Sequence, residues 1–426
     1  MRLIAAPPAP FLTPMRLALA VWLLLGISVS VRTVLQPTSH TVFPIFVIAA
    51  ERYWSDQGLY DELPDLDYFR YPPPFAVFVS PVALLGPTLG GIVWAWLSIA
   101  ALVYGLRRFA ADVLPEDWGE ARTAGLIALG ALGAVRGLWN AQSNALIVGL
   151  LLVGVAELTK RQYWRSALWL GAAVGLKATP LPVVLLLLAL YPIRLGPRLA
   201  VVLLAVGLVP FLTKPPALVV DHYEQWQAHL RATSGTRWPG FRDAYTVVQA
   251  VRHTVEGRAD PFPYGERLDS ATYRAVQLLT AGAALAWCLW LRRRLRSDQG
   301  HGEAILLNAT LGIGCAWLLL FGPATEHPTY VFLAPSLAYA LLARDVWPRG
   351  RWLAIASFVL VMLLGWNGAV RPFSEHVPLV LTALPLGTAL LAAWLVGSES
   401  ARPGLASMAA SNRIADHSAP QRRKSA

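Results

Sequence analysis

The chain has 426 residues, of which 56% are hydrophobic and only 14% charged, and its formal net charge is +11. Soluble domains usually carry about 25% charged residues, so this composition excludes an ordinary soluble fold. Apolar runs of roughly 15–20 residues predict transmembrane helices. The positive charge lies in short clusters between these runs, which is typical of cytoplasmic loops and argues against a nucleic-acid-binding surface.

The first apolar run, about residues 15–35, lacks a small-residue cleavage site and predicts a retained anchor with a cytoplasmic N-terminus. Residues 36–71 form a polar segment that we predict outside, and within it residues 43–58 have the spacing of an interfacial helix. Residues 72–106 are interrupted by proline and glycine. They predict either one broken crossing or two short helices.

Five apolar runs follow between residues 122 and 213, and five more between residues 275 and 396. The polar segment 214–274 predicts a second external loop, partly helical. Residues 398–426 predict a disordered cytoplasmic tail. The sequence therefore predicts one all-α polytopic membrane domain over residues 1–397, a bundle of about 12 transmembrane helices with interfacial helices in both external loops.

Four breaks between the predicted helices lack basic clusters, and all fall on the predicted external side. Several adjoin unusually short helices, and irregular backbone persists at membrane depth only where protein or water surrounds it. We therefore predict that the four breaks line one cavity that opens outward. They are the acidic stretch before Tyr71, then residues 139–144, 177–180 and 322–328.

Lys177 lies between two apolar runs, opposite the basic loops. An intramembrane cation is costly and by default marks a functional site with an anionic partner. The alternative is a lysine that reaches the external interface. Both cysteines, Cys288 and Cys315, lie inside apolar runs and predict neither a disulfide framework nor a metal site.

The other breaks carry polar side chains, and each has both a ligand-binding and a structural interpretation. Glu326 and His327 could bind a phosphate through the imidazole or hydrogen-bond a sugar, or they could form an ordinary interfacial pair. Arg136 could meet a phosphate or a lipid headgroup. Three neighbouring amides suit sugar hydroxyls or cap a helical turn; they are Asn140, Gln142 and Asn144.

The acidic segment 61–67 could supply a general base, hold a divalent metal or be a solvated loop. The chain has no phosphate-binding glycine-rich loop, no His-Glu-x-x-His pattern and no nucleophile elbow. These absences argue against ATP-driven chemistry.

Six short motifs occur in order along the chain. They are Ala49-Ala50, Gly58-Leu59-Tyr60-Asp61, Phe69-Arg70-Tyr71-Pro72-Pro73, Gln142-Ser143-Asn144, Gly175-Leu176-Lys177-Ala178-Thr179-Pro180 and Glu326-His327. Together, over about residues 43–335, they resemble family 87 of the glycosyltransferases, within the GT-C superfamily of multi-helix membrane enzymes.

The resemblance implies a polyprenyl-phosphate-linked sugar, commonly mannose, as donor. It implies inverting transfer to a lipid or glycan acceptor on the external face of the cell (inner) membrane. It places Lys177 and His327 near the donor phosphate or elsewhere in the active site, and Arg136 and Arg70 are further cations available to the phosphate. No cofactor is expected, although a divalent metal is not excluded.

One position departs from the family pattern. The family usually has an Asp seven residues before the Ala-Ala pair, where this chain has Val42. Either another carboxylate acts as general base or the chain has a different or lost activity. Four carboxylates of the first external loop are candidates for the base: Asp61, Asp56, Glu51 and Asp67. Asp61 is preferred because it lies in a family motif. The competing functions are a transporter or lipid flippase, for which repeated halves would be expected, and a non-catalytic membrane protein.

Overall fold

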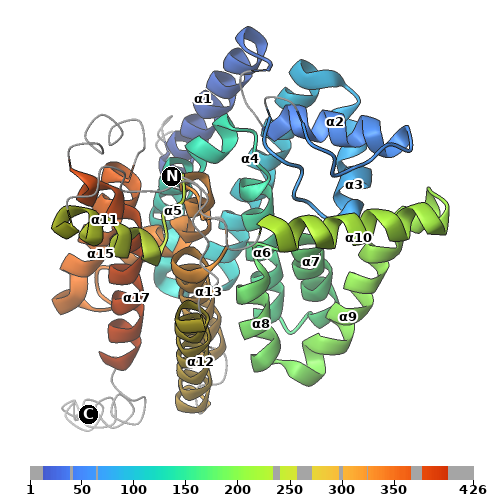
Figure 1. Ribbon diagram of the computed structural model, residues 1–426. Helices are drawn as coiled ribbons and strands as arrows, with labels where there is room; N and C mark the ends of the chain where they lie inside the picture. Colours follow the sequence, from blue (N-terminus) through green and yellow to red (C-terminus); the bar gives the residue numbers. More distant parts are fainter. Residues whose placement is uncertain are drawn as a thin grey trace, which may run out of the picture.

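The computed structural model describes residues 13–38, 42–63, 66–233, 240–256, 271–296, 301–323, 325–365 and 377–401. In these ranges all regular structure is helical (Figure 1), as the sequence predicts. The predicted tail lies mostly outside the described residues, and its first residues, 398–401, belong to the last helix, which ends at Ala401.

Seven described helices are long and apolar enough to cross a bilayer. They are α1 (Pro14–Leu35), α4 (Gly86–Asp112), α5 (Gly119–Trp139), α9 with η2 (Pro192–Leu212), α12 (Ala271–Arg294), α13 (His301–Phe321) and the segment Leu379–Ala401 of η6 and α17. Five shorter helices lie where the sequence predicts further crossings, so the total of about 12 stays a prediction. They are α6 (Asn144–Thr159), α7 (Tyr163–Leu176), α8 (Leu181–Leu190), α14 (Ala334–Leu342) and α15 (Arg351–Phe358).

Residues 72–106 form two helices, which settles the choice that the sequence left open. The first is α3 (Pro73–Ala83), and α4 begins three residues later. The chain reverses at Gly86, whose backbone φ of 82° lies in the left-handed region that favours glycine. The predicted interfacial helix before them is α2 (Val42–Trp54).

The second polar segment contains α10 (Pro216–Thr233) and α11 (Ala244–Glu256). Figure 1 shows both lying across the direction of the long helices. The indole of Trp226 on α10 donates a hydrogen bond to the carbonyl oxygen of Arg70 at 3.3 Å. The two polar segments therefore meet at the same end of the bundle.

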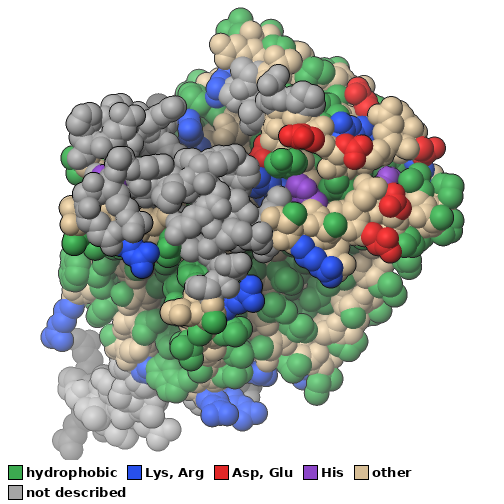
Figure 2. All heavy atoms as spheres, viewed as in Figure 1, with side chains coloured by type: hydrophobic (Ala, Val, Ile, Leu, Met, Phe, Trp, Pro, Cys, Tyr) green, Lys and Arg blue, Asp and Glu red, His purple; other side chains and the backbone are tan. Residues whose placement is uncertain are grey.

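Ion pairs join the helices at the opposite end, which we call the basic end. The Arg108 guanidinium lies 2.8 Å from Glu157, and the Lys160 ammonium lies 2.9 Å from Asp112. Arg161 reaches Glu303 at 3.6 Å. Figure 2 shows Lys and Arg side chains along this lower edge, whereas Asp and Glu gather at the upper right.

The other end, which we call the site end, is where α1, α5 and α7 finish and α4 and α6 begin. There the Trp94 indole donates a hydrogen bond to the carbonyl oxygen of Ala141 at 3.0 Å. The predicted alternation of basic turns and non-basic breaks thus corresponds to two ends of one bundle. Which end faces outward stays a prediction.

An aromatic cluster attaches the first polar segment to the bundle at the site end. The ring centroids of Phe46 and Tyr71 are 5.1 Å apart, and those of Tyr71 and Phe75 are 4.1 Å apart. Aromatic pairs at such distances contribute about 0.5–1.5 kcal/mol beyond their burial. Val42 packs against the edge of this cluster. The cluster therefore fixes residues 69–75, and with them one wall of the site.

Candidate functional site

The four breaks meet in space at the site end. The Lys177 Nζ donates a hydrogen bond to Asn144 Oδ1 at 2.7 Å and lies 5.3 Å from the centroid of the Tyr71 ring. The Tyr71 and Ser143 hydroxyls are 3.0 Å apart. The Asn144 Nδ2 donates to the carbonyl oxygen of Pro328 at 3.3 Å. Each break thus contributes a residue to one connected polar group.

Local sequence explains why Lys177 points inward. It is the C-cap of α7 and has an extended backbone (φ −156°, ψ 127°), so the helix ends there. The following Pro180 precedes α8, whose first turn also holds a proline. The ammonium group consequently lies beside the first residue of α6, Asn144, which is fully buried. The positive end of the α6 dipole and the lysine therefore favour an anion at the same place.

Glu326 faces this group. The pKa of its carboxyl is raised by burial and also by the nearby Asp67, while Arg70 and Lys177 act in the opposite direction. Gln142 lies near the carboxyl and also acts to lower its pKa. A carboxyl with a raised pKa, next to a second carboxylate and a lysine, is suited to hydrogen bonding and proton exchange with a bound polyol.

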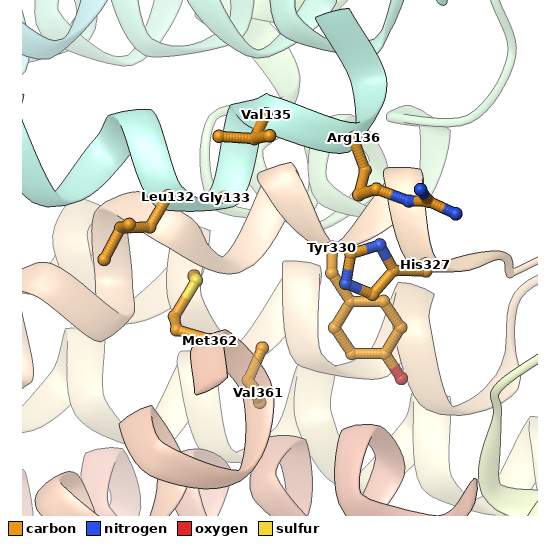
Figure 3. A pocket seen from close by; sticks show the side chains of 8 residues that line it. All are labelled: Leu132, Gly133, Val135, Arg136, His327, Tyr330, Val361 and Met362. Carbon is orange, nitrogen blue, oxygen red and sulfur yellow. The ribbon is translucent and has the colours of Figure 1, made fainter. Parts of the chain in front are cut away.

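His327 faces a different set of neighbours. Burial, with contributions from Arg136 and Arg242, lowers the pKa of His327 to about 4. The imidazole is therefore neutral at ordinary pH, and its buried Nδ1 has no hydrogen-bond partner within the described residues. Figure 3 shows the imidazole beside the Arg136 side chain at the edge of a pocket. His327 can accept or donate a hydrogen bond there, but it does not supply a positive charge.

The four candidate bases have unequal positions. Asp67 lies 2.9 Å from Arg70, keeps 49% of its side chain exposed and acts electrostatically on Glu326. Asp61 is exposed, and its carboxylate lies where a Cβ on Gly58 would stand. Asp56 pairs with the Lys214 ammonium, and Glu51 is exposed on α2.

Of the remaining predicted residues, one belongs to the polar group and another caps a helix beside it. Gln142 accepts a hydrogen bond from Asn144 at 2.8 Å and so belongs to the polar group. Asn140 is the C-cap of α5, and its backbone N–H donates to the carbonyl oxygen of Arg136 at 3.0 Å. No three His, Cys, Asp or Glu side chains are grouped as a metal site in the part of the chain that the structure describes.

Sequence reasoning missed two residues of the site end. Arg32 stacks on Trp139 with its guanidinium 4.8 Å from the ring centroid, and Arg242 neighbours His327. Arg32 carried a usable signal, because it is a basic residue at the end of α1 where basic clusters are not expected. Arg242 lies in a polar segment without a distinguishing pattern.

Comparison with known families gives one match. The family model described as glycosyltransferase family 87 matches residues 69–323, which is more than half of the chain. The match includes Tyr71, Asn144 and Lys177 and ends just before Glu326. No curated protein matches the chain.

Proposed function

We propose that this chain, which belongs to glycosyltransferase family 87, transfers a hexose from a polyprenyl-phosphate donor to a lipid or glycan acceptor with inversion. Membership of the family makes it a membrane glycosyltransferase. Mannose is the first sugar to test, because the family resemblance implies it. The observation that carries the proposal is the meeting of four chain breaks around Lys177, with the Glu326 carboxyl acting electrostatically on both Lys177 and Asp67.

The charge pattern suits a phosphate leaving group. Lys177 forms no ion pair within the described residues, and it lies at the positive end of α6. When the bond between the sugar C1 and the phosphate oxygen breaks, its electron pair goes to the phosphate. A fixed cation at that position stabilises the developing negative charge.

The acceptor needs a base on the opposite face of the sugar. Its hydroxyl forms the new bond to C1 while a carboxylate takes the proton, and this geometry inverts the anomeric centre. We propose Asp67 for this role in place of Asp61. Asp67 is accessible to an acceptor, is oriented by Arg70 and lies near Glu326. Glu326 and Gln142 are proposed to hydrogen-bond sugar hydroxyls.

The proposed location is the cell membrane, with the site end outside and both termini in the cytoplasm. The supporting observation is the gathering of Lys160, Arg161 and Arg194 at the basic end, since cytoplasmic loops carry an excess of Lys and Arg. The polyprenyl chain would then remain in the bilayer while its sugar enters the site from outside.

The test is a transfer assay on the purified chain in lipid nanodiscs, with a panel of polyprenyl-phosphate sugars and a lipid extract as acceptor. Asp67→Asn should lower the rate about a hundredfold or more, as expected for a lost general base. Asp61→Asn should change it by less than about threefold, because the Asp61 carboxylate is exposed and lies against Gly58. The opposite ranking of the two variants would overturn Asp67 as base, and a wild type that transfers no sugar would overturn the function. NMR of the product reports the anomeric configuration.

A further inference from the structure

Residues 67–71 carry two groups of the site but belong to no helix or strand. Asp67, at the start of this segment, pairs with Arg70, and the ring of Tyr71, at its end, lies 5.3 Å from the Lys177 Nζ. A helix or strand would fix the positions of these residues through its own backbone hydrogen bonds. Here the positions depend on side chains from other parts of the chain.

Two side chains hold adjacent peptide units of this segment. The Tyr60 hydroxyl donates a hydrogen bond to the carbonyl oxygen of Tyr71 at 2.8 Å. The Trp226 indole donates one to the carbonyl oxygen of Arg70 at 3.3 Å. Tyr60 belongs to the same polar segment, whereas Trp226 comes from α10, in the second polar segment. The position of residues 67–71 therefore depends on α10.

His229, three residues after Trp226, makes a second contact from α10. Its ring centroid lies 5.1 Å from that of Tyr68 and 6.3 Å from that of Tyr60. Burial, with a smaller contribution from Arg70, lowers the pKa of His229, while Asp67 acts in the opposite direction. The imidazole is therefore neutral at ordinary pH, and it contacts the segment as an aromatic ring.

The start of α10 is fixed to the bundle by contacts that do not involve residues 67–71. Lys214, two residues before the helix, pairs with Asp56 and donates a hydrogen bond to the carbonyl oxygen of Trp54 at 3.1 Å. The Tyr223 hydroxyl donates to the carbonyl oxygen of Gly207 on α9 at 2.7 Å. α10 is thus attached to the end of α2 and to α9, and it can serve as a support for a third segment.

The sequence of α10 places the supporting side chains on one face. Val219, His222, Trp226 and His229 follow one another at steps of three and four residues, which is the spacing of one helix face. Val219 and His222 are fully buried, and Gln227 on another face is exposed. A helix that only covered the bundle could use aliphatic residues throughout this face. Trp226 instead supplies an N–H group at the position where it reaches the Arg70 carbonyl oxygen.

We propose that Trp226 and His229 are positioning residues, which hold residues 67–71 so that the proposed base is correctly placed relative to the Lys177 group. The inference rests on the proposed function for the roles of Asp67 and Lys177. Both α10 side chains act through residues 67–71 and not on the reacting atoms. A small displacement of the base lowers the rate of the chemical step, because that step requires aligned groups.

The first experiment separates the rate of transfer from donor binding. Trp226→Phe keeps an aromatic ring and loses the N–H group. It should lower kcat about 3- to 10-fold and change the donor KM by less than about twofold, because Lys177 keeps its contacts. Gln227→Ala, at the next position on α10, should change neither value. His229→Ala should act in the same direction as Trp226→Phe.

The second experiment measures amide hydrogen exchange of residues 66–71 by mass spectrometry, with the full chain in nanodiscs. Exchange there should be about 2- to 10-fold faster in Trp226→Phe and unchanged in Gln227→Ala. Thermal unfolding identifies any variant that fails to fold, and Trp226→Phe is the milder substitution should His229→Ala do so.

Unchanged exchange in folded Trp226→Phe would overturn the inference. Faster exchange with a wild-type kcat, or a raised donor KM with a wild-type kcat, would overturn it as well. The exchange measurement needs no turnover, so it still decides whether α10 holds residues 67–71 if the wild type transfers no sugar. That last result would count against the proposed function.

Discussion

Replacing Lys177 by alanine removes a positive charge that lies beside the first residue of α6. In the folded chain its ammonium donates to Asn144 at 2.7 Å and lies 5.3 Å from the Tyr71 ring centroid. Both contacts hold the amine in place, so it is oriented before a donor arrives. A preorganised cation of this kind stabilises charge that develops on a leaving phosphate.

The expected loss follows from the contact that is removed. A hydrogen bond to a charged group contributes about 1.5–3 kcal/mol, and about 1.36 kcal/mol corresponds to a factor of ten in rate. Lys177→Ala should therefore lower kcat about 10- to 150-fold if the contact forms in the transition state. The assay is single-turnover transfer from a radiolabelled polyprenyl-phosphate sugar in nanodiscs, at saturating donor.

Two controls separate chemistry from folding. Lys177→Arg keeps the charge and should recover part of the rate, whereas Lys160→Ala removes an exposed lysine at the basic end and should leave transfer unchanged. Thermal unfolding of each variant is measured in the same nanodiscs, because the Lys177→Ala mutation leaves the buried Asn144 Oδ1 without its partner. A folded Lys177→Ala protein with wild-type turnover would refute the reasoning and return the lysine to a structural role.

Three further predictions follow from burial and topology. Folding lowers the pKa of His327 to about 4. As pH falls from about 6.5, the unfolded chain therefore binds a proton before the folded chain does, and the free energy of unfolding declines by up to about 3 kcal/mol. The His327→Gln protein should lack this part of the decline, and the same dependence of unfolding on pH in both proteins would contradict the prediction. Gly105→Ala should destabilise the chain by about 1–3 kcal/mol, since its Cβ would lie 2.6 Å from the carbonyl oxygen of Gly149, whereas Gly282→Ala meets open space and should not. Maleimide labelling of intact cells should modify the Arg231→Cys protein and spare the Arg293→Cys protein. Both native cysteines are fully buried, so they should add no background labelling. Equal labelling of the two variants would refute the proposed orientation.

Much of the architecture follows from patterns that act over long stretches. Apolar runs and the alternation of basic turns predict which chain breaks share an end of the bundle, because each crossing helix carries the chain from one side of the bilayer to the other. That is why Tyr71, Asn144, Lys177 and Pro328 could be expected near one another from four distant segments. The break at Gly86 was harder, since a proline-rich run fits both a kinked helix and a reversal, and only the glycine φ decides between them.

The choice among the acidic residues depended on tertiary contacts that motifs do not encode. Asp61 belongs to a family-like motif, yet its own backbone is occupied with Arg52, which donates to its carbonyl oxygen at 2.8 Å. Asp67 has no distinguishing motif, but Arg70 three residues later pairs with it and the aromatic cluster seats the segment against the site. Local sequence similarity therefore favours Asp61 as the base, whereas the packing leads us to propose Asp67, and the choice between them stays a prediction.

Glu326 and His327 show why adjacent residues need not share a role. As sequence they read as one polar pair, and both were assigned to one ligand. Glu326 has an extended backbone (φ −98°, ψ 165°) immediately before the 3₁₀ helix η3 (His327–Leu333). Successive side chains on extended backbone point to opposite sides, so the carboxyl turns toward Lys177 and the imidazole toward Arg136. One peptide unit thus lies between the cations that act on Glu326, Lys177 and Arg70, and those that act on His327, Arg136 and Arg242.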